Sequence, residues 1–222
     1  MNDRSTAGLE QAAARLQTTT AVDHLFGEFK GSIDRATIEM LYEHSLQALS
    51  AARVTSFTPT LAERFTRERL QALASTSDRT GALPSVLFLC VHNAGRSQMA
   101  AGWFRSLAGG RATVYSGGSD PTSDLNPVAV EAMREVGISI ADEFPKPWTD
   151  EVARAVNVIV TMGCGDECPV YPGVRVVDWD LDDPAELGIE AVRPIRDEIG
   201  QRVRGLLAEL GVDVTSTEGG HA

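Results

Sequence analysis

"SVLFLCVHNAGRS", residues 85–97, joins a short apolar run to a cysteine, five mostly small residues, an arginine and a serine. An apolar run of this length, bounded by polar residues, predicts a buried strand over 85–90. The next segment, "SQMAAGWFRSLA" (97–108), has the composition of a helix. The stretch therefore predicts a strand, a loop and a helix in direct succession.

The same alternation continues toward the C-terminus. Strands are predicted at "ATVYSGG" (112–118), "VNVIVTM" (156–162) and "VRVVDW" (174–179), and helices at "LNPVAVEAMREVG" (125–137) and "EAVRPIRDEIGQRVRGLLAEL" (190–210). Alternating strands and helices indicate an α/β domain, here a four-stranded parallel sheet flanked by helices over 81–222. Ligands of such sheets bind beyond the carboxyl ends of the strands, which is where Cys90 falls.

The first 80 residues have a different, helical period. Apolar residues recur at helical spacing from Val22 to Phe29 and again from Ile38 to Leu49, with Asp34 placed as an N-cap. A third helix is predicted from Thr58, with Pro59 at its first position. The prediction is a three-helix bundle over 1–80, followed by the linker-like stretch "STSDRTGALP" (75–84).

Composition restricts the possible functions. The net charge is −11, and residues 84–222 carry −10 of it. Such an acidic surface disfavours general nucleic-acid binding, and the near-neutral helical bundle, without a basic helix, argues against a DNA-binding regulator. No apolar run reaches the ~20 residues of a membrane span, and the N-terminus lacks the apolar core of a secretory signal, so a cytoplasmic protein is expected. An anion site in this chain would have to be locally positive within an acidic surface.

The loop after the first strand has the chemistry of an oxyanion site. The predicted oxyanion-binding residues, hereafter the anion loop, are Cys90, Val91, His92, Asn93, Ala94, Gly95, Arg96 and Ser97. Loop N–H groups and a helix N-terminus carry partial positive charge, and Arg96 can donate two hydrogen bonds to a tetrahedral anion. The same field favours the nucleophilic thiolate form of Cys90, and Ser97 can donate a hydrogen bond to it. The alternative is a buried cysteine that only packs at the end of a strand.

Two further motifs follow the last two predicted strands. In "WDLDDPA" (179–185), Asp183 is the candidate general acid, although Asp178, Asp180 and Asp182 compete with it and clustered acids often form a solvated loop. In "TMGCGDECPVYPG" (161–173), Cys164 and Cys168 are candidate redox partners for Cys90. Two thiolates supply only half of a tetrahedral zinc site, so no metal is predicted, and two purely structural cysteines remain the other alternative.

Together these motifs resemble a known family. "CVHNAGRSQMAAGWF", "YSGGSDP", "NPVAVEAM", "VIVTMGCGDECP" and "DWDLDDPA" are similar, in this order, to thioredoxin-coupled arsenate reductases of the low-molecular-weight protein tyrosine phosphatase fold. Actinobacterial members are similar in carrying "GCGD-x-CP" and an N-terminal three-helix extension. The resemblance covers most of residues 85–210.

The resemblance implies a three-cysteine relay. Cys90 would attack arsenate held by Arg96 and the loop amides while Asp183 protonates the departing oxygen. Cys164 would then release arsenite and form a disulfide with Cys90, and Cys168 would resolve that disulfide into Cys164–Cys168. Thioredoxin would act as the external reductant, with no cofactor bound. The expected partners are therefore arsenate, arsenite and thioredoxin, and the chain would be a monomer or a dimer through its helical bundle.

Two alternatives and one departure accompany this resemblance. A low-molecular-weight protein tyrosine phosphatase needs Cys90, Arg96, Ser97 and Asp183 but neither later cysteine. A mycothiol-coupled arsenate reductase replaces those cysteines with a small thiol. Members of the family often bind potassium through a loop Asn and a Glu in the following helix. Asn93 is present here, but Ala101 stands at the position of the Glu.

Overall fold

The structure is a computed structural model that describes residues 3–51, 58–77, 83–163 and 171–214. Its helices are α1 (Asp3–Glu28), α2 (Arg35–Ala51), α3 (Thr58–Ser77), α4 (Arg96–Ala108), α5 (Pro127–Glu135), α6 (Asp150–Ala155) and α7 (Ile189–Glu209). Its strands are β1 (Ser85–Cys90), β2 (Thr113–Gly118), β3 (Val158–Met162) and β4 (Arg175–Asp178). No helix in these ranges combines the length and apolar character needed to cross a bilayer.

The sheet confirms the predicted α/β fold. The described strands form a four-stranded sheet in the order β2-β1-β3-β4, and every pair is parallel. β1 lies between β2 and β3, with Cys90 opposite Gly118 on one side and Met162 on the other. The carboxyl end of β1 is thus flanked by two strands that end at the same level, which brings the loops after all three together.

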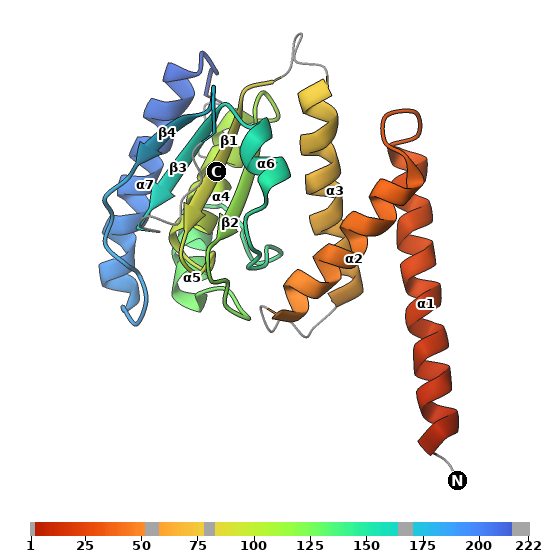
Figure 1. The fold of residues 1–222 in the computed structure, drawn as a ribbon. Helices are drawn as coiled ribbons and strands as arrows, with labels where there is room; N and C mark the ends of the chain where they lie inside the picture. Colours follow the sequence, from red (N-terminus) through yellow and green to blue (C-terminus); the bar gives the residue numbers. More distant parts are fainter. Residues whose placement is uncertain (1–2, 52–57, 78–82, 164–170, 215–222) are drawn as a thin grey trace, which may run out of the picture.

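Helices cover both faces of the sheet (Figure 1). Val86, Phe88 and Cys90 face α4, α5 and α7, and Phe88 packs edge-on against Phe104 of α4 with ring centroids 5.8 Å apart. Leu87 and Leu89 point to the opposite face, as the two-residue period of a strand requires. A strand buried on both faces reads as a continuous apolar run, which is why "VLFL" predicted β1.

Helices α6 and α3 cover the second face of the sheet. α6 was not predicted; with Asp150–Ala155 it is too short to show a clear helical period. The other helix is α3, whose Ala72 is fully buried in the same cluster as Leu87 and Leu89. Helix α3 therefore belongs to the core of the sheet as well as to the N-terminal helices.

The N-terminal helices form the predicted three-helix extension around their own apolar cluster. The cluster contains Val22, Leu25, Phe29, Ile38, Leu41, Tyr42, Leu49, Phe65 and Leu70, together with Phe144 from the α/β region. Asp34 caps α2 as predicted: its Oδ1 accepts the N–H of Thr37 at 3.0 Å, and the hydrogen bonds from Thr37 lower the pKa of this carboxyl. The division of the chain at residue 80 stays a prediction, since α3 packs on both sides of it.

Helix α1 is longer than the apolar pattern predicted. The pattern covers Val22–Phe29, but the helix begins at Asp3 and its first half projects away from the other elements (Figure 1). Leu16, near the middle of the helix, is 69% exposed. Hydrophobic periodicity predicts only the part of a helix that packs against a neighbour, so the projecting half carried no such signal.

Glu135 joins α5 to α7 and supplies a pH-dependent prediction. Its carboxylate accepts two hydrogen bonds from Arg193, at 2.6 and 2.9 Å, and one from Arg196 at 3.1 Å. The Arg193 hydrogen bonds hold the pKa of Glu135 at about 2, below the ordinary 4.5. Its contribution to stability is therefore complete above pH 4.5 and is lost as the pH falls from there toward 2.

We expect Glu135→Gln to be less stable than the wild type at pH 6, with a difference that shrinks steadily below pH 4.5. Urea unfolding of both proteins at several pH values measures this difference. Glu190→Gln is the matched control, because Glu190 also pairs with Arg193 but is largely exposed. A difference that stays constant from pH 6 to pH 3.5 would contradict the lowered pKa.

Candidate active site

Cys90 ends β1 at the carboxyl edge of the sheet and lies at the centre of the predicted anion loop. Its side chain is only 3% exposed. The N–H of Asn93 donates to the Cys90 sulfur at 3.2 Å, and the Ser97 hydroxyl lies 3.0 Å from it. Both contacts stabilise a negative charge on the sulfur, as expected for a thiolate nucleophile.

The backbone of the anion loop turns its carbonyl groups away from the sulfur. The carbonyls of Cys90, Val91, His92 and Ala94 accept N–H groups of Ser119, Asp120, Thr122 and Asn126, at distances of 2.9–3.3 Å. The segment after β2 thus satisfies the outer side of the loop. Its inner side, which carries the Asn93 N–H and meets the first turn of α4, is the side that suits an anion.

Arg96 begins α4, and its guanidinium pairs with Asp183. Arg96 Nη2 lies 2.6 Å from Asp183 Oδ2, and Nη1 donates to the carbonyl of Leu181 at 3.4 Å. The Arg96 side chain is buried, whereas that of Asp183 is 52% exposed. The structure therefore brings Asp183 to the anion loop, from a segment almost ninety residues further along the chain.

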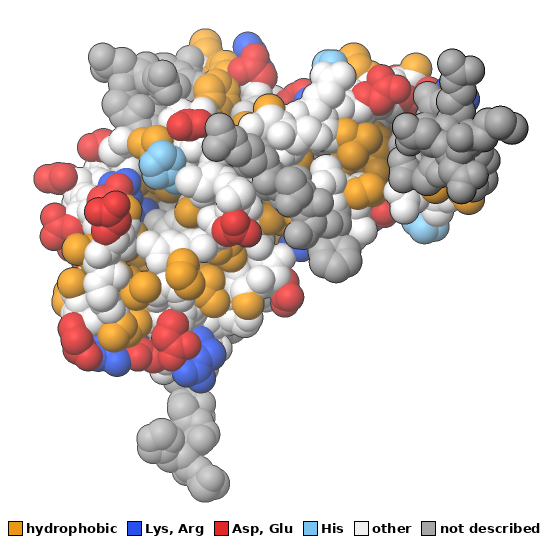
Figure 2. Space-filling model, turned by 90° about the horizontal axis from the view of Figure 1, so that it is seen from below, with side chains coloured by type: hydrophobic (Ala, Val, Ile, Leu, Met, Phe, Trp, Pro, Cys, Tyr) orange, Lys and Arg blue, Asp and Glu red, His pale blue; other side chains and the backbone are white. Residues whose placement is uncertain are grey.

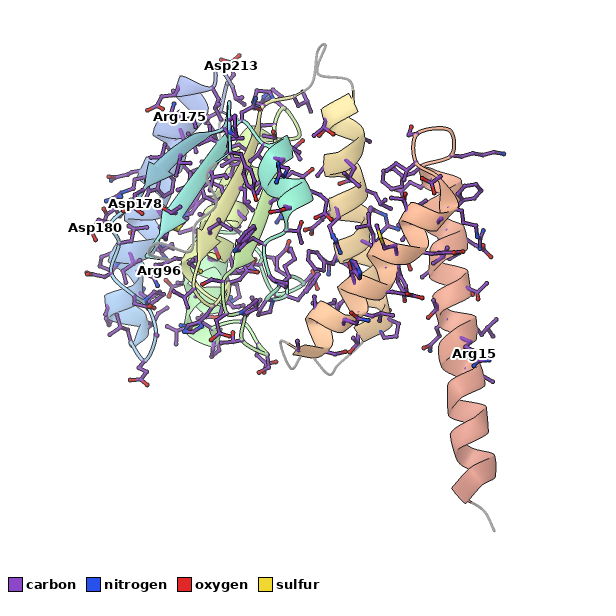
Figure 3. All side chains as sticks on the ribbon, viewed as in Figure 1. Arg15, Arg96, Arg175, Asp178, Asp180 and Asp213 are labelled. Atoms are coloured by element: carbon purple, nitrogen blue, oxygen red, sulfur yellow. The ribbon has the colours of Figure 1, made fainter. Side chains whose placement is uncertain are left out.

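The competing aspartates do not reach this position. Asp178 accepts a hydrogen bond from the Thr161 hydroxyl, and Asp180 and Asp182 are exposed. Figure 3 shows Arg96 at the carboxyl end of the sheet, with Asp178 and Asp180 along its β4 edge. Of the four candidates, Asp183 is the one whose carboxylate contacts a residue of the anion loop.

The Asp-Pro segment also packs directly on the anion loop. A Cβ atom added to Gly95 would lie 2.9 Å from Pro184 Cγ, closer than real Cβ atoms approach, so only glycine allows this contact. Asn126 holds the same junction: its backbone N–H donates to Ala94, and its Nδ2 donates to the Pro184 carbonyl at 3.1 Å. Asn126 was not predicted as a site residue, because an Asn before Pro at the start of a helical run looks simply like an N-cap, which it also is.

These residues enclose a cavity of about 40 Å³. Its lining residues are Cys90, His92, Ala94, Gly95, Arg96, Asn126, Asp183, Pro184 and Ala185. Pockets for drug-sized ligands measure about 300–1,000 Å³, so this cavity suits a small inorganic oxyanion. Figure 2, which views the molecule from below, shows Asp and Glu side chains spread more widely than Lys and Arg over that face. The arginine site is therefore a local exception on an acidic surface.

Cys164 and Cys168 lie outside the described residues. Gly163, the residue before Cys164 in the chain, is described: its φ is +75°, and a Cβ added to it would lie 3.2 Å from Arg96 Nη1. The chain leaving β3 thus passes against the guanidinium of the anion loop. His92 is exposed and lines the cavity, with Nδ1 3.0 Å from the Asp120 carbonyl.

The described residues contain no cluster of three or more His, Cys, Asp or Glu side chains arranged for a metal ion. Asn93, which the resemblance connects with potassium, uses its side-chain carbonyl elsewhere. That oxygen accepts the Lys146 N–H at 3.0 Å and Gln98 Nε2 at 3.1 Å. The catalytic roles of the predicted site residues stay predictions, but the structure places Cys90, Arg96 and Asp183 around one cavity, with the Ser97 hydroxyl next to the Cys90 sulfur.

Comparison with known proteins agrees with this geometry. The family model "Low molecular weight phosphotyrosine protein phosphatase" matches residues 85–216, and "Protein-tyrosine-phosphatase-like, N-terminal domain" matches residues 18–74. The solved Corynebacterium glutamicum thioredoxin-dependent arsenate reductase is 39% identical, with a TM-score of 0.78, and the match covers 87% of this chain and 96% of that one.

Two further relatives match the α/β region. Arsenate reductase 2 of Staphylococcus saprophyticus is 39% identical over 124 residues, which are 54% of this chain and 93% of that protein. A solved arsenate reductase in a phosphate-binding state is 32% identical with a TM-score of 0.51, covering 58% of this chain and 99% of that one. On the fold, the cysteine–arginine loop and these matches, the chain belongs to the low molecular weight phosphotyrosine protein phosphatase family.

Proposed function

We propose that this protein reduces arsenate to arsenite at Cys90. The observation that carries the proposal is the convergence of one buried thiol, one arginine and one aspartate on a cavity of about 40 Å³. An arsenate ion is small, tetrahedral and anionic, so it matches both the size and the hydrogen-bonding character of this cavity. The relatives named arsenate reductase support the choice of substrate.

The first step follows from the geometry around Cys90. Arg96 and the loop N–H groups bind the arsenate oxygens, which places the arsenic next to the sulfur. The Cys90 thiolate attacks the arsenic, and one arsenate oxygen departs after it takes a proton from Asp183. The short contact between Asp183 and Arg96 keeps this carboxyl at the entrance of the site, within reach of an oxygen bound to the guanidinium.

The later steps require two more thiols. The Cys164 thiolate attacks the Cys90 sulfur; the new S–S bond forms as the sulfur–arsenic electron pair stays on arsenic, which leaves as arsenite. Cys168 then attacks Cys164, which frees the Cys90 thiolate and leaves a Cys164–Cys168 disulfide. Each step is a thiolate displacement, and the two cysteines together supply the two electrons that arsenate needs. Gly163, the last described residue before Cys164, lies close enough to Arg96 that a Cβ added to it would be 3.2 Å from Nη1.

Thioredoxin is the proposed external reductant, and no bound cofactor is required. Its dithiol would reduce the Cys164–Cys168 disulfide by the same exchange chemistry. The Corynebacterium glutamicum relative, which is named thioredoxin-dependent, matches this chain through its helical extension as well as its α/β region. This agreement favours thioredoxin over a small thiol such as mycothiol.

A phosphotyrosine phosphatase would use the same loop, but the cavity fits it less well. Aryl phosphate sites gain affinity from aromatic side chains that stack on the substrate ring. The described residues that line this cavity include no Phe, Tyr or Trp. We therefore expect inorganic oxyanions to be preferred over aryl phosphate esters.

Serine substitution at Cys164 and at Cys168 tests the relay. With thioredoxin, thioredoxin reductase and NADPH, each variant should release at most about one arsenite per enzyme, whereas the wild type turns over repeatedly. Asp166→Asn, between the two cysteines, is the control and should retain multiple turnovers. Multiple turnovers by either serine variant would refute the relay. If they appear only after mycothiol is added, the small-thiol mechanism is correct instead.

A further inference from the structure

A buried lysine connects the helical extension to the anion loop. The Lys146 side chain is only 3% exposed, and its Nζ lies 3.3 Å from Glu68 Oε1 on α3 and 4.6 Å from the centre of the Phe144 ring. The backbone N–H of the same lysine donates to Asn93 Oδ1 at 3.0 Å. One residue thus contacts α3 with its side chain and the anion loop with its backbone.

Phe144 makes a second connection of the same kind. Its ring is buried in the apolar cluster of α1, α2 and α3, where the Arg64 guanidinium lies 5.1 Å from the ring centre. Its carbonyl accepts Gln98 Nε2 at 3.1 Å, and the same nitrogen donates to the backbone carbonyl of Asn93. The side chains of segment 144–146 therefore contact the helical extension, while its backbone groups form hydrogen bonds with Gln98 and Asn93.

Asn93 connects segment 144–146 to the Cys90 thiol through a hydrogen bond to Ser97. Its Nδ2 donates to the Ser97 hydroxyl at 2.8 Å, and that hydroxyl lies 3.0 Å from the Cys90 sulfur. Its φ of 49° lies in the left-handed region, which asparagine tolerates better than most residues other than glycine, and hydrogen bonds to its side chain and backbone hold it there. Two of the hydrogen-bond donors that hold Asn93, the Lys146 N–H and Gln98 Nε2, come from outside the anion loop.

We propose that α3 positions the anion loop, with Glu68 acting through Lys146 and Asn93 to hold the Ser97 hydroxyl against the Cys90 thiolate. Glu68 is thus a positioning residue rather than a catalytic one. The inference rests on the proposed nucleophilic role of Cys90, but it is independent of which oxyanion is the substrate. It also gives the N-terminal extension a function: α3 supplies the carboxylate that lies beside the buried Lys146 ammonium.

Replacing Glu68 is expected to affect the thiolate fraction of Cys90 in two opposite ways, through the lost charge and through displacement of segment 144–146. The proposal is testable because the two effects differ in sign. The ionisable groups that interact with Glu68 are Lys146, Glu143, Arg64 and Tyr115; burial raises the pKa of Glu68 and raises that of Tyr115 to about 12. In Glu68→Gln, the loss of a negative charge alone would favour the thiolate. If the ammonium instead moves toward water, it displaces segment 144–146, and the hydrogen bonds that stabilise the thiolate are weakened.

The experiment measures alkylation of Cys90 by iodoacetamide as a function of pH in the prereduced full-length protein. Mass spectrometry of the Cys90 peptide separates this thiol from the other two. For Glu68→Gln we expect the midpoint of the pH profile to rise by about one unit, which is about a tenfold loss of thiolate at neutral pH. An unchanged or lowered midpoint would overturn the proposal.

Two further variants separate positioning from general damage to the fold. Glu63→Gln removes another carboxylate of α3, one that pairs with Arg67, and should leave the midpoint unchanged. Glu68→Gln combined with Lys146→Met removes both charges of the buried pair, so the midpoint should return to within about 0.3 units of the wild type. A double variant as perturbed as Glu68→Gln would contradict the route through Lys146. The wild-type midpoint itself tests Cys90 as the nucleophile, so the two ideas can fail separately.

Discussion

Replacing Cys90 with serine is expected to abolish arsenate reduction, by a factor on the order of 10⁴ or more. A serine hydroxyl is hardly ionised near neutral pH, so it is a poor nucleophile in the same cavity. The stronger reason is redox chemistry, because a serine oxygen cannot form the disulfide that carries two electrons away from arsenic. Arsenate-dependent NADPH oxidation in the thioredoxin system measures the effect.

The Cys90→Ser variant should still bind oxyanions. Serine is nearly isosteric with cysteine, and the contacts from the Asn93 N–H and from Ser97 can be made to oxygen as well as to sulfur. Arg96 is unchanged, so phosphate binding, measured by calorimetry, should stay within about tenfold of the wild type. If the variant binds phosphate yet retains more than about one hundredth of the wild-type turnover, another residue is the nucleophile.

Much of the fold could be predicted from the sequence because its strands are buried on both faces. β1, β3 and the helices α4 and α7 have uninterrupted or strongly periodic apolar patterns, and each lies within two residues of its predicted bounds. The differences have local causes: α6 is too short to show a helical period, and the apolar spacing that predicts the first helix begins only at Val22. The packing of α3 against the sheet as well as against α1 and α2 was not predictable either. Its buried residue in the apolar cluster of the sheet is a single small one, Ala72.

Residues of the candidate site were predicted where a distinctive chemical group follows a predicted strand, and missed where the residue type gives no sign of the contact it makes. Cys90, Arg96 and Asp183 are chemically distinctive and follow predicted strands. Lys146 is different, because its contact with the loop is made by a backbone N–H that any residue other than proline could supply. Asn126 and Gln98 likewise look like ordinary helix residues until the fold places them beside Pro184 and Asn93.

The second large effect is expected from Arg96→Lys, which should lower kcat/KM for arsenate about 10²–10³-fold. The guanidinium reaches Asp183 Oδ2 through Nη2 and the Leu181 carbonyl through Nη1, so it is held in one plane with its donors in fixed directions. A lysine ammonium is a single point of charge and cannot hold Asp183 and two oxyanion oxygens at once. Arg105→Lys is the matched control on the same helix; Arg105 pairs with Glu143 and is half exposed, so activity should stay within about twofold of the wild type.

Arg96 contacts Asp183, so its loss could act on the aspartate alone, and phosphate inhibition separates the two roles. If Arg96 binds the oxyanion directly, the inhibition constant for phosphate should rise about as much as kcat/KM falls. The same rise is then expected in an Asp183→Asn background, where the ion pair with Asp183 no longer exists. If Arg96→Lys has no further effect on phosphate inhibition in that background, the arginine serves only to orient Asp183, and the loop N–H groups bind the anion without it.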